Sequence, residues 1–216
     1  MSAYRISRVV TAAESLALVT LDQAKAALGI PLDDTTQDAA LSSQIDSVSA
    51  AINAYCNRIF AVQEYADQIR NLCGYWGEPL VTRQFPIVEE GGVPLVTVSE
   101  DGGLPLDAGY LELHPETGSL YRLDSAGAAP GAWGAALTLV EYTAGFVTVP
   151  PDVQGAALEW LGTRWYAVGR DPALRSETVP DLLTQVYAGD AGAGTYGGAV
   201  PPGTRDLLAP YRIWFV

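Results

Sequence analysis

Lysine is nearly absent from this sequence: Lys25 is the single lysine among its 12 basic residues. Against them stand 25 Asp and Glu residues, so the formal net charge of the 216-residue chain is −13. A protein that grips the backbone of a nucleic acid needs clustered positive charge. The charge balance therefore argues against specific DNA binding and against attraction to anionic membranes.

Histidine and cysteine are equally scarce, with one His and two Cys in the whole chain. A zinc site made of these residue types is not expected, and two cysteines do not form a disulfide scaffold in a chain of this length. No apolar run reaches the roughly 18 residues of a membrane helix. Residues 1–19 lack the apolar core and the cleavage site of a signal peptide. We therefore expect no metal site, no membrane span and no signal peptide.

The apolar residues, 49% of the chain, follow a helical period near the N-terminus. Thr20 and Gln23 have the spacing of a capping box, and Gly29 suits the end of the helix that they begin. A longer helix is predicted by an apolar stripe in which successive members are three or four positions apart. Its members are Leu41, Ile45, Val48, Ile52, Tyr55 and Ile59. The two predicted helices indicate a helical hairpin.

The middle of the chain changes to short runs rich in Val, Leu and Tyr, separated by turns that contain Gly, Pro and Asp. The runs are residues 81–85, 95–99, 110–113, 119–123 and 137–142. They predict a small antiparallel β unit. This part is also the most acidic, because residues 59–150 hold three cations and twelve anions, a net charge of −9.

Helical signals return at Pro150–Pro151–Asp152, because proline suits the first helical turn and aspartate there interacts favourably with the helix dipole. Residues 179–187 are a further helix candidate. We therefore predict an α+β fold: a small α-helical bundle with an inserted antiparallel β unit and an extended C-terminal arm. The helical core comprises residues 1–60 and 150–187, the β insert residues 61–149, and the flexible arm residues 188–216.

Three patterns suggest chemistry or ligand binding, and each has a plainer interpretation. Residues 192–197 match G-x-G-x-x-G but lack the preceding strand and following helix of a dinucleotide site, which favours a linker. His114 is a candidate general base for a small hydrolase, or an ordinary turn residue. The aromatic-rich insert also suits a carbohydrate- or peptide-binding module on a helical stalk. With no complete catalytic set and no cofactor loop, we expect neither enzymatic activity nor a cofactor.

The order of several short motifs resembles that of tailed-phage head–tail connector (adaptor or head-completion) proteins, a family that includes the adaptors of phage-like gene transfer agents. The N-terminal motifs are residues 18–25 (LVTLDQAK) and 38–58. Later motifs are residues 85–87 (FPI), 98–102 (VSEDG), 110–113 (YLEL), 118–122 (GSLYR), 140–146 (VEYTAGF), 149–158 and 207–212 (LLAPYR). The ordered set spans most of the chain.

The resemblance implies a structural protein of the virion neck, the head–tail junction, that is assembled in the cytoplasm of the bacterial host. Many copies, typically twelve, would form a ring below the portal protein. The ring would extend the DNA channel and present a surface to the next neck or tail component, the stopper. DNA would pass through without specific binding, which agrees with the negative charge because carboxylates repel phosphates at short range.

Two sets of residues are candidates for contact with partners. A subunit interface is expected at small residues of the long helix and at an aromatic–arginine pair of the later helix: Ala40, Ala51, Ala54, Trp160 and Arg164. The apolar C-terminal residues would dock on the portal, the partner that the resemblance favours: Leu207, Leu208, Tyr211, Arg212, Ile213, Trp214 and Phe215. The alternatives are that Trp160 lies in the core and that the C-terminal residues pack on the chain's own helices.

Overall fold

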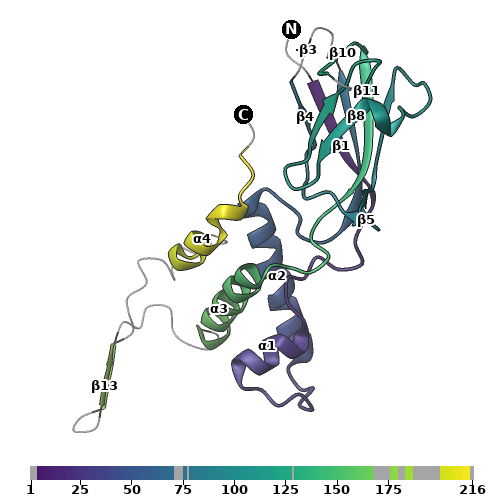
Figure 1. Ribbon diagram of the computed structural model, residues 1–216. Helices are drawn as coiled ribbons and strands as arrows, with labels where there is room; N and C mark the ends of the chain where they lie inside the picture. The colour runs from purple at the N-terminus through teal and green to yellow at the C-terminus, as the bar shows by residue number, and fades with distance from the viewer. Residues whose placement is uncertain are drawn as a thin grey trace. The chain divides into compact units, whose positions relative to one another are not determined.

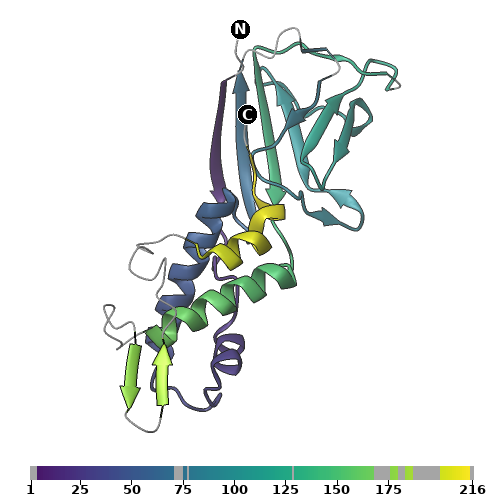
Figure 2. The same ribbon diagram turned by 90° about the vertical axis from the view of Figure 1, so that its left-hand side faces the viewer.

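The computed structural model describes residues 4–70, 75–76, 78–127, 129–167, 176–179, 183–186 and 200–214. The chain divides into two compact units, each made of two separate stretches of sequence. The β unit comprises residues 1–15 and 60–148, and the helical unit comprises residues 16–59 and 149–216. Figures 1 and 2 show the strands of the first unit and the helices of the second.

The elements confirm the predicted α+β class. The helices are α1 (Leu21–Leu28), α2 (Asp38–Cys56), α3 (Pro151–Ala167) and α4 (Pro202–Leu208), with 3-10 turns η1 (Ala108–Tyr110) and η2 (Ala209–Tyr211). The longer strands are β1 (Tyr4–Thr11), β2 (Gln63–Arg70), β7 (Val96–Glu100), β8 (Leu111–His114), β9 (Ser119–Arg122), β11 (Leu137–Ala144), β12 (Ser176–Val179) and β13 (Leu183–Val186). Two-residue strands are β3 (Tyr75–Trp76), β4 (Leu80–Val81), β5 (Glu89–Glu90), β6 (Val93–Pro94) and β10 (Ala132–Trp133).

The helical unit follows the sequence pattern closely. Thr20 and Gln23 form the predicted capping box at the start of α1, and Gly29 ends the helix at φ 69°, a left-handed conformation that favours glycine. In α2 the first four members of the apolar stripe, from Leu41 to Ile52, are buried. The helix ends at Cys56, so Ile59 lies beyond it. The predicted helical hairpin is therefore confirmed.

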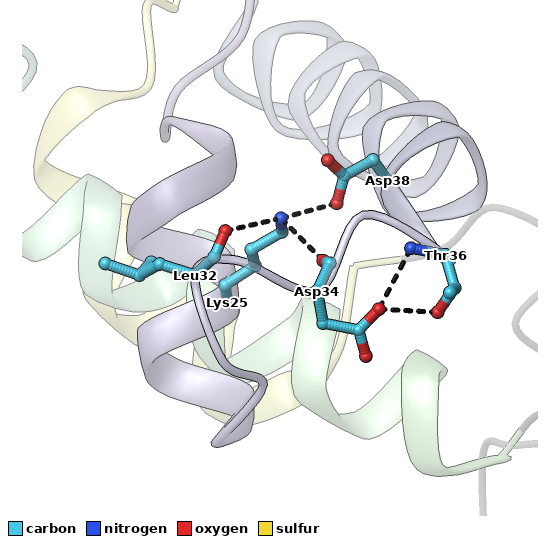
Figure 3. Close-up of polar contacts among 5 residues, drawn as sticks. All are labelled: Lys25, Leu32, Asp34, Thr36 and Asp38. Atoms are coloured by element: carbon cyan, nitrogen blue, oxygen red, sulfur yellow. Dashed lines mark hydrogen bonds and ion pairs between the residues drawn. The ribbon is translucent and has the colours of Figure 1, made fainter.

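The single lysine joins α1 to the start of α2 (Figure 3). The Lys25 ammonium lies 2.6 Å from a carboxylate oxygen of Asp38 and donates to the carbonyl oxygens of Asp34 and Leu32 at 2.9 and 3.3 Å. These three oxygens match the three donors of an ammonium group, which compensates for the loss of water around a residue that is only 2% exposed. Hydrogen bonds from Thr36 lower the pKa of Asp34 in the same loop.

The β unit contains a four-stranded antiparallel sheet in the order β1–β2–β11–β7 and a three-stranded sheet in the order β4–β9–β8. Alternate residues of β2 and β11 face a common core; Tyr65 stands opposite Tyr142, and their rings stack at 5.5 Å. The core is a single cluster of buried residues: Tyr65, Ile69, Leu80, Ile87, Val98, Leu120, Trp133, Val140, Tyr142 and Ala144.

One carboxylate lies inside this core. Asp67 is fully buried and accepts hydrogen bonds from the backbone amide of Arg83 (2.9 Å) and from the hydroxyl of Tyr142 (3.1 Å). Burial and the negative charge of Asp67 raise the pKa of Tyr142, and the same two causes raise the pKa of Tyr65 to about 12. These bonds attach the chain after β4 to the middle of the large sheet.

Several boundaries differ from the sequence-based expectation. Residues 4–11, expected in the helical core, form β1 of the β unit, and β2 was not predicted. The run 81–85 is a strand only at its start. After β4, the Thr82 hydroxyl donates to the carbonyl of Gln84 (2.9 Å), and the amide of Gln84 donates to the Tyr142 hydroxyl in β11 (3.2 Å), so the backbone leaves the strand ladder. Residues 179–187 were expected to be helical, but the described part of this segment is the antiparallel hairpin of β12 and β13. Thr178, Val179, Thr184 and Val186 are β-branched residues, which favour strands over helices.

Candidate assembly surfaces

The C-terminal segment from α4 to Trp214 packs on the helical unit. The backbone amide of Ile213 donates to the carbonyl of Cys56 at the end of α2 (2.9 Å). The hydroxyl of Tyr211 donates to the carboxylate of Asp152 near the start of α3 (3.1 Å). Burial and this hydrogen bond raise the pKa of Tyr211. The described part of the expected arm is therefore held at both α2 and α3.

An arginine lies between two aromatic rings at the end of this segment. The central carbon of the Arg212 guanidinium is 3.9 Å from the ring centroid of Trp214 and 5.0 Å from that of Tyr55. Contacts of this kind contribute about 0.5–1 kcal/mol at exposed sites. Trp214 is nevertheless 70% exposed. A tryptophan held in place beside an arginine, with most of its surface free, is typical of the residues that dominate binding interfaces.

The seven predicted docking residues differ in how deeply they are buried. Leu208 and Ile213 are buried in the helical unit, so for these two positions the prediction of partner contact is corrected. The reason is that α4 packs on α3 and turns its apolar side inward. Leu207 and Trp214 are exposed, and Tyr211 and Arg212 are half-buried. Phe215, and residues 188–199 of the expected arm, lie outside the described residues.

The residues of the predicted subunit interface on α2 and α3 also differ in how deeply they are buried. Ala40 and Ala54 are exposed and Ala51 is half-buried, so this face of α2 is accessible. Trp160 is only 3% exposed and belongs to the core, which corrects its assignment to the interface. The Arg164 guanidinium donates to the hydroxyl of Ser47 (3.0 Å) and lies 5.9 Å from the Trp160 ring. Arg164 thus ties α3 to α2 at Ser47, which is seven positions after Ala40 and therefore on the same face of α2 as the alanines.

His114, the candidate general base, lies at the end of β8 beside an open hollow of about 560 Å³. Its Nε2 atom is 3.4 Å from a Glu112 carboxylate oxygen, and its ring meets the Tyr121 ring edge-on at 5.7 Å. The nearby hydroxyls of Thr117 and Ser119 bond to each other at 3.0 Å. These contacts hold the imidazole against a carboxylate and an aromatic ring, and they do not orient a hydroxyl nucleophile toward it.

The acidic residues of the insert lie mainly on its surface. Asp67 is the one buried carboxylate of residues 59–150, and the other eleven are exposed or half-buried. Among the residues that the structure describes, no group of three or more His, Cys, Asp and Glu side chains is placed to hold a metal ion. No helix within the described ranges is both long and apolar enough to span a membrane.

Strand β1 is a surface feature that the sequence analysis missed. It is an edge strand of the large sheet, and its exposed apolar residues are Tyr4, Ile6, Val9 and Val10. Because both faces of the strand are accessible, the alternation of buried and exposed residues that marks a strand is lost. The remaining signal is the β-branched content of residues 6–11, which is too short and too charged to decide between strand and loop.

Comparison with known proteins gives two results. Residues 18–75 match the family model of the phage gp6-like head-tail connector protein. Over almost its whole length the chain is also similar to a chain of a solved structure described as "Neck of empty GTA particle computed with C6 symmetry". The TM-score is 0.56 and the identity 17%, over 98% of this chain and 97% of that chain.

Two further solved structures are similar to the same extent. They are described as "Virion of native gene transfer agent (GTA) particle" (TM-score 0.55, 17% identity) and "Neck of native GTA particle computed with C12 symmetry" (TM-score 0.52, 18% identity). Each likeness covers 98% of this chain and 97% of the other, and at this identity it shows the fold. No curated protein matches the sequence. The resemblance to the head–tail connector family is thus confirmed by a family match and a shared fold.

Proposed function

We propose that this chain is a structural head–tail connector (adaptor) subunit in the virion neck of a tailed phage or phage-like particle. The observation that carries the proposal is that two comparisons agree. Residues 18–75, which span α1, α2 and β2, match the connector family model, and the fold of the whole chain is similar to that of chains in gene transfer agent particles. We propose no catalytic role, because the described contacts of His114 do not orient a nucleophile.

The connector subunits form a ring of twelve copies below the portal, in accordance with the C12 symmetry used for one similar neck. The ring extends the DNA channel and offers the attachment surface for the stopper. Assembly takes place in the cytoplasm of the bacterial host. The alanine face of α2, with Ala40, Ala51 and Ala54, allows a neighbouring subunit to approach closely because these side chains are small. Arg164 reaches this face through its hydrogen bond to Ser47.

The portal contact is made by the exposed residues of the C-terminal segment, with Trp214 as the central residue and Leu207, Tyr211 and Arg212 around it. The exposed carboxylates of the β unit leave DNA free to pass without specific binding, since like charges repel at short range.

The test is assembly of the purified chain on portal-containing particles, followed by electron microscopy of the neck. The expected result is a ring next to the portal. Ala51→Glu should abolish it and leave the thermal stability of the free chain nearly unchanged, because Ala51 is only half-buried within the subunit and lies outside its core. Ser42→Glu is the matched control: Ser42 is exposed, nine residues earlier in α2, and thus half a turn around the helix. Normal ring assembly by the Ala51 variant would contradict the interface.

A further inference from the structure

The loop that follows β7, residues 101–107, holds one leucine almost completely in solvent. Leu104 is 88% exposed. The loop is nevertheless bonded to the end of β7: the amide of Gly103 donates to the carbonyl of Glu100 (2.9 Å), and the amide of Leu106 donates to that of Val98 (2.8 Å). A single exposed leucine is ordinary on a protein surface, so its surroundings decide whether it is a contact residue. We call residues 101–107 the Leu104 loop.

The Leu104 loop is also acidic. Asp101 and Asp107 lie on either side of Leu104 in the sequence, and both are exposed. Their carboxylates accept hydrogen bonds from the backbone amides of Leu137 (2.9 Å) and Gly109 (2.8 Å), respectively. Neither carboxylate forms an ion pair with a residue that the structure describes. The loop therefore combines one exposed apolar side chain with two unneutralised negative charges.

The opposite side of the same sheet carries complementary groups. The strand order β1–β2–β11–β7 places β1 at one edge and β7, with the Leu104 loop, at the other. Tyr4 pairs with Arg70 of β2, and alternation along β1 puts Ile6 and Arg8 on the same face as Tyr4. Tyr4 and Ile6 are 60% and 45% exposed, and both arginines are exposed. We call these four residues, Tyr4, Ile6, Arg8 and Arg70, the arginine face.

The two arginines of this face have no carboxylate partner within the described part of the chain. Arg8 and Arg70 form no ion pair there, although the β unit carries 13 anions and only five cations. A charge on an edge strand, such as Arg8, protects the edge from pairing with another strand, and so does the bulge in β1. Arg70 lies on the interior strand β2, so edge protection does not explain it. A contact on this face is therefore made by side chains.

The loop and the arginine face lie at the same end of the sheet. Tyr4 pairs with Arg70, Arg70 pairs with Leu137, and the amide of Asp101 donates to the carbonyl of Leu137 (2.8 Å). One row thus crosses the sheet from Tyr4 to the first residue of the loop. Within one chain the edges are about 14 Å apart, three strand spacings. A second copy, rotated about an axis along the strands, presents its loop to the arginine face at the same level.

We propose that the Leu104 loop of one copy packs on the arginine face of the next copy in the ring. Leu104 contacts Tyr4 and Ile6, and the carboxylates of the loop approach Arg8 and Arg70. Such a contact is heterologous, which is the kind of interface that closes a ring. The opposite charges determine which surface is accepted. The inference rests on the proposed ring, but it names a contact distinct from the alanine face of α2.

Two full-length variants, each altered on one side of this contact, test it directly. Leu104→Lys places a positive charge opposite the arginines, and Arg70→Glu places a negative charge opposite the acidic loop. Each variant alone should self-associate at least about tenfold more weakly than the unaltered chain, because like charges then meet in the contact. Sedimentation velocity with and without portal measures it. Both positions are exposed, so thermal unfolding of the free chains should stay unchanged.

Mixing the two variants separates a contact between copies from damage within one chain. In a ring of alternating copies, the unaltered loop of one variant meets the unaltered face of the other, and at the next contact Leu104→Lys meets Arg70→Glu with opposite charges. A one-to-one mixture should therefore assemble to within about threefold of the unaltered chain, and so should both substitutions in one chain. Variants that stay unassembled in the mixture overturn the proposal.

Val93 provides the matched controls, since it is 65% exposed in β6 of the same unit and belongs to neither surface. Val93→Lys and Val93→Glu should assemble normally, and an equal loss there would attribute the effect to added charge alone and overturn the contact.

The remaining outcomes separate this inference from the proposed function. Arg70→Glu chains that form rings as readily as the unaltered chain overturn the loop contact and leave the connector proposal intact. The same holds if this variant self-associates normally but no longer joins portal-containing particles, because the arginine face then serves a different protein. Absence of any ring from the unaltered chain, with or without portal, overturns both proposals.

Discussion

The helical unit and the β unit of this chain differ in how far their ends and edges are bonded to other parts of the chain. In the helical unit, segments distant in sequence bond to one another: Lys25 holds the start of α2, and the amide of Ile213 holds its end. In the β unit, the sheet ends in an open strand with exposed apolar residues. The excess of acid also differs, with a net charge of −8 for the β unit (five cations, 13 anions) and −5 for the helical unit (seven cations, 12 anions).

The difference shows which surfaces of this chain remain accessible to partners. Apolar groups that are needed for the subunit's own stability are already buried in the helical unit, Leu208 and Trp160 among them. What remains accessible is a small set of features: the alanine face of α2, the Trp214 side chain and the β1 edge. A connector needs surfaces of this kind for a neighbour, a portal and a further neck protein. Four measurements test whether the two units differ in stability and in partner contact.

The largest expected effect comes from a cavity in the helical core. Ile52 is fully buried in α2, and Ile52→Ala should lower the free energy of unfolding by about 2–5 kcal/mol. If the two units are separately stable, hydrogen exchange should accelerate in α1, α2 and α3 and stay unchanged in β2 and β11. Val140→Ala is the reciprocal variant in the β core. Equal acceleration of both units by either variant would show that they unfold together.

The next effect concerns the buried ammonium. Lys25→Met should cost about 2–3 kcal/mol, below the 3–5 kcal/mol of a fully buried pair because Asp38 stays 29% exposed. The loss comes from two carbonyls and one carboxylate that no longer have their donor. Urea unfolding of the variant measures it. Asp38→Asn should cost less, since the amide oxygen still accepts, and a larger cost for that variant would contradict the assigned geometry.

Alkaline pH should lower the free energy of unfolding of both units, and the decrease should begin at a different pH in each. Burial raises the pKa of the Cys56 thiol from 9.0 to about 11 in the helical unit, and that of Tyr65 from 10.0 to about 12 in the β unit. Each group keeps its proton longer in the folded state, so its contribution is complete below the unfolded pKa and is lost as pH rises toward the folded one.

The stability should therefore fall from pH 9 for the helical unit and from pH 10 for the β unit. The slope is about 1.4 kcal/mol per pH unit for each proton released only on unfolding. Urea midpoints followed by circular dichroism would show it. Cys56→Ala should remove the loss between pH 9 and 10, and an unchanged profile would exclude the thiol as its cause.

The smallest effect on stability is expected at the residue proposed to matter most for the portal. Trp214→Ala removes one exposed ring and its contact with Arg212, so unfolding should change by about 1 kcal/mol or less. Incorporation into portal-containing particles should be lost. Tyr166→Ala, an exposed aromatic on α3, serves as the control and should be incorporated normally. A Trp214 variant that joins particles as efficiently as the unaltered chain would remove this residue from the interface.

Features that depend on neighbouring residues in the sequence were predictable. The capping box at Thr20, the left-handed glycine at 29 and the stripe from Leu41 to Ile52 all follow from helical spacing, and the structure confirms them. The turns of the insert and most of its strand positions follow from glycine and proline placement. The resemblance to connectors was also present in the order of the motifs, which the family match over residues 18–75 supports.

Features that depend on partners elsewhere in the chain were not predictable. The sequence of β1 does not show which of its faces is covered, because an edge strand with two accessible faces has no pattern to display. The run 179–187 has apolar spacing compatible with a helix, but residues 176–179 and 183–186 pair as strands. The buried Asp67 also escaped notice, since only its hydrogen bonds to Arg83 and Tyr142 distinguish it from the exposed acids around it.

Caps, periodicity and composition act over a few residues or over the whole chain, so the α+β class, the start and end of α1 and the excess of negative charge could be read from the sequence. Which of several similar apolar residues remain exposed depends on how the chain packs. Leu208 and Trp214 look equally suited to a partner in the sequence, yet one is fully buried and the other is 70% exposed. The physical reason is that burial depends on the side chains around a residue, and here these come from α2 and α3, far away along the chain.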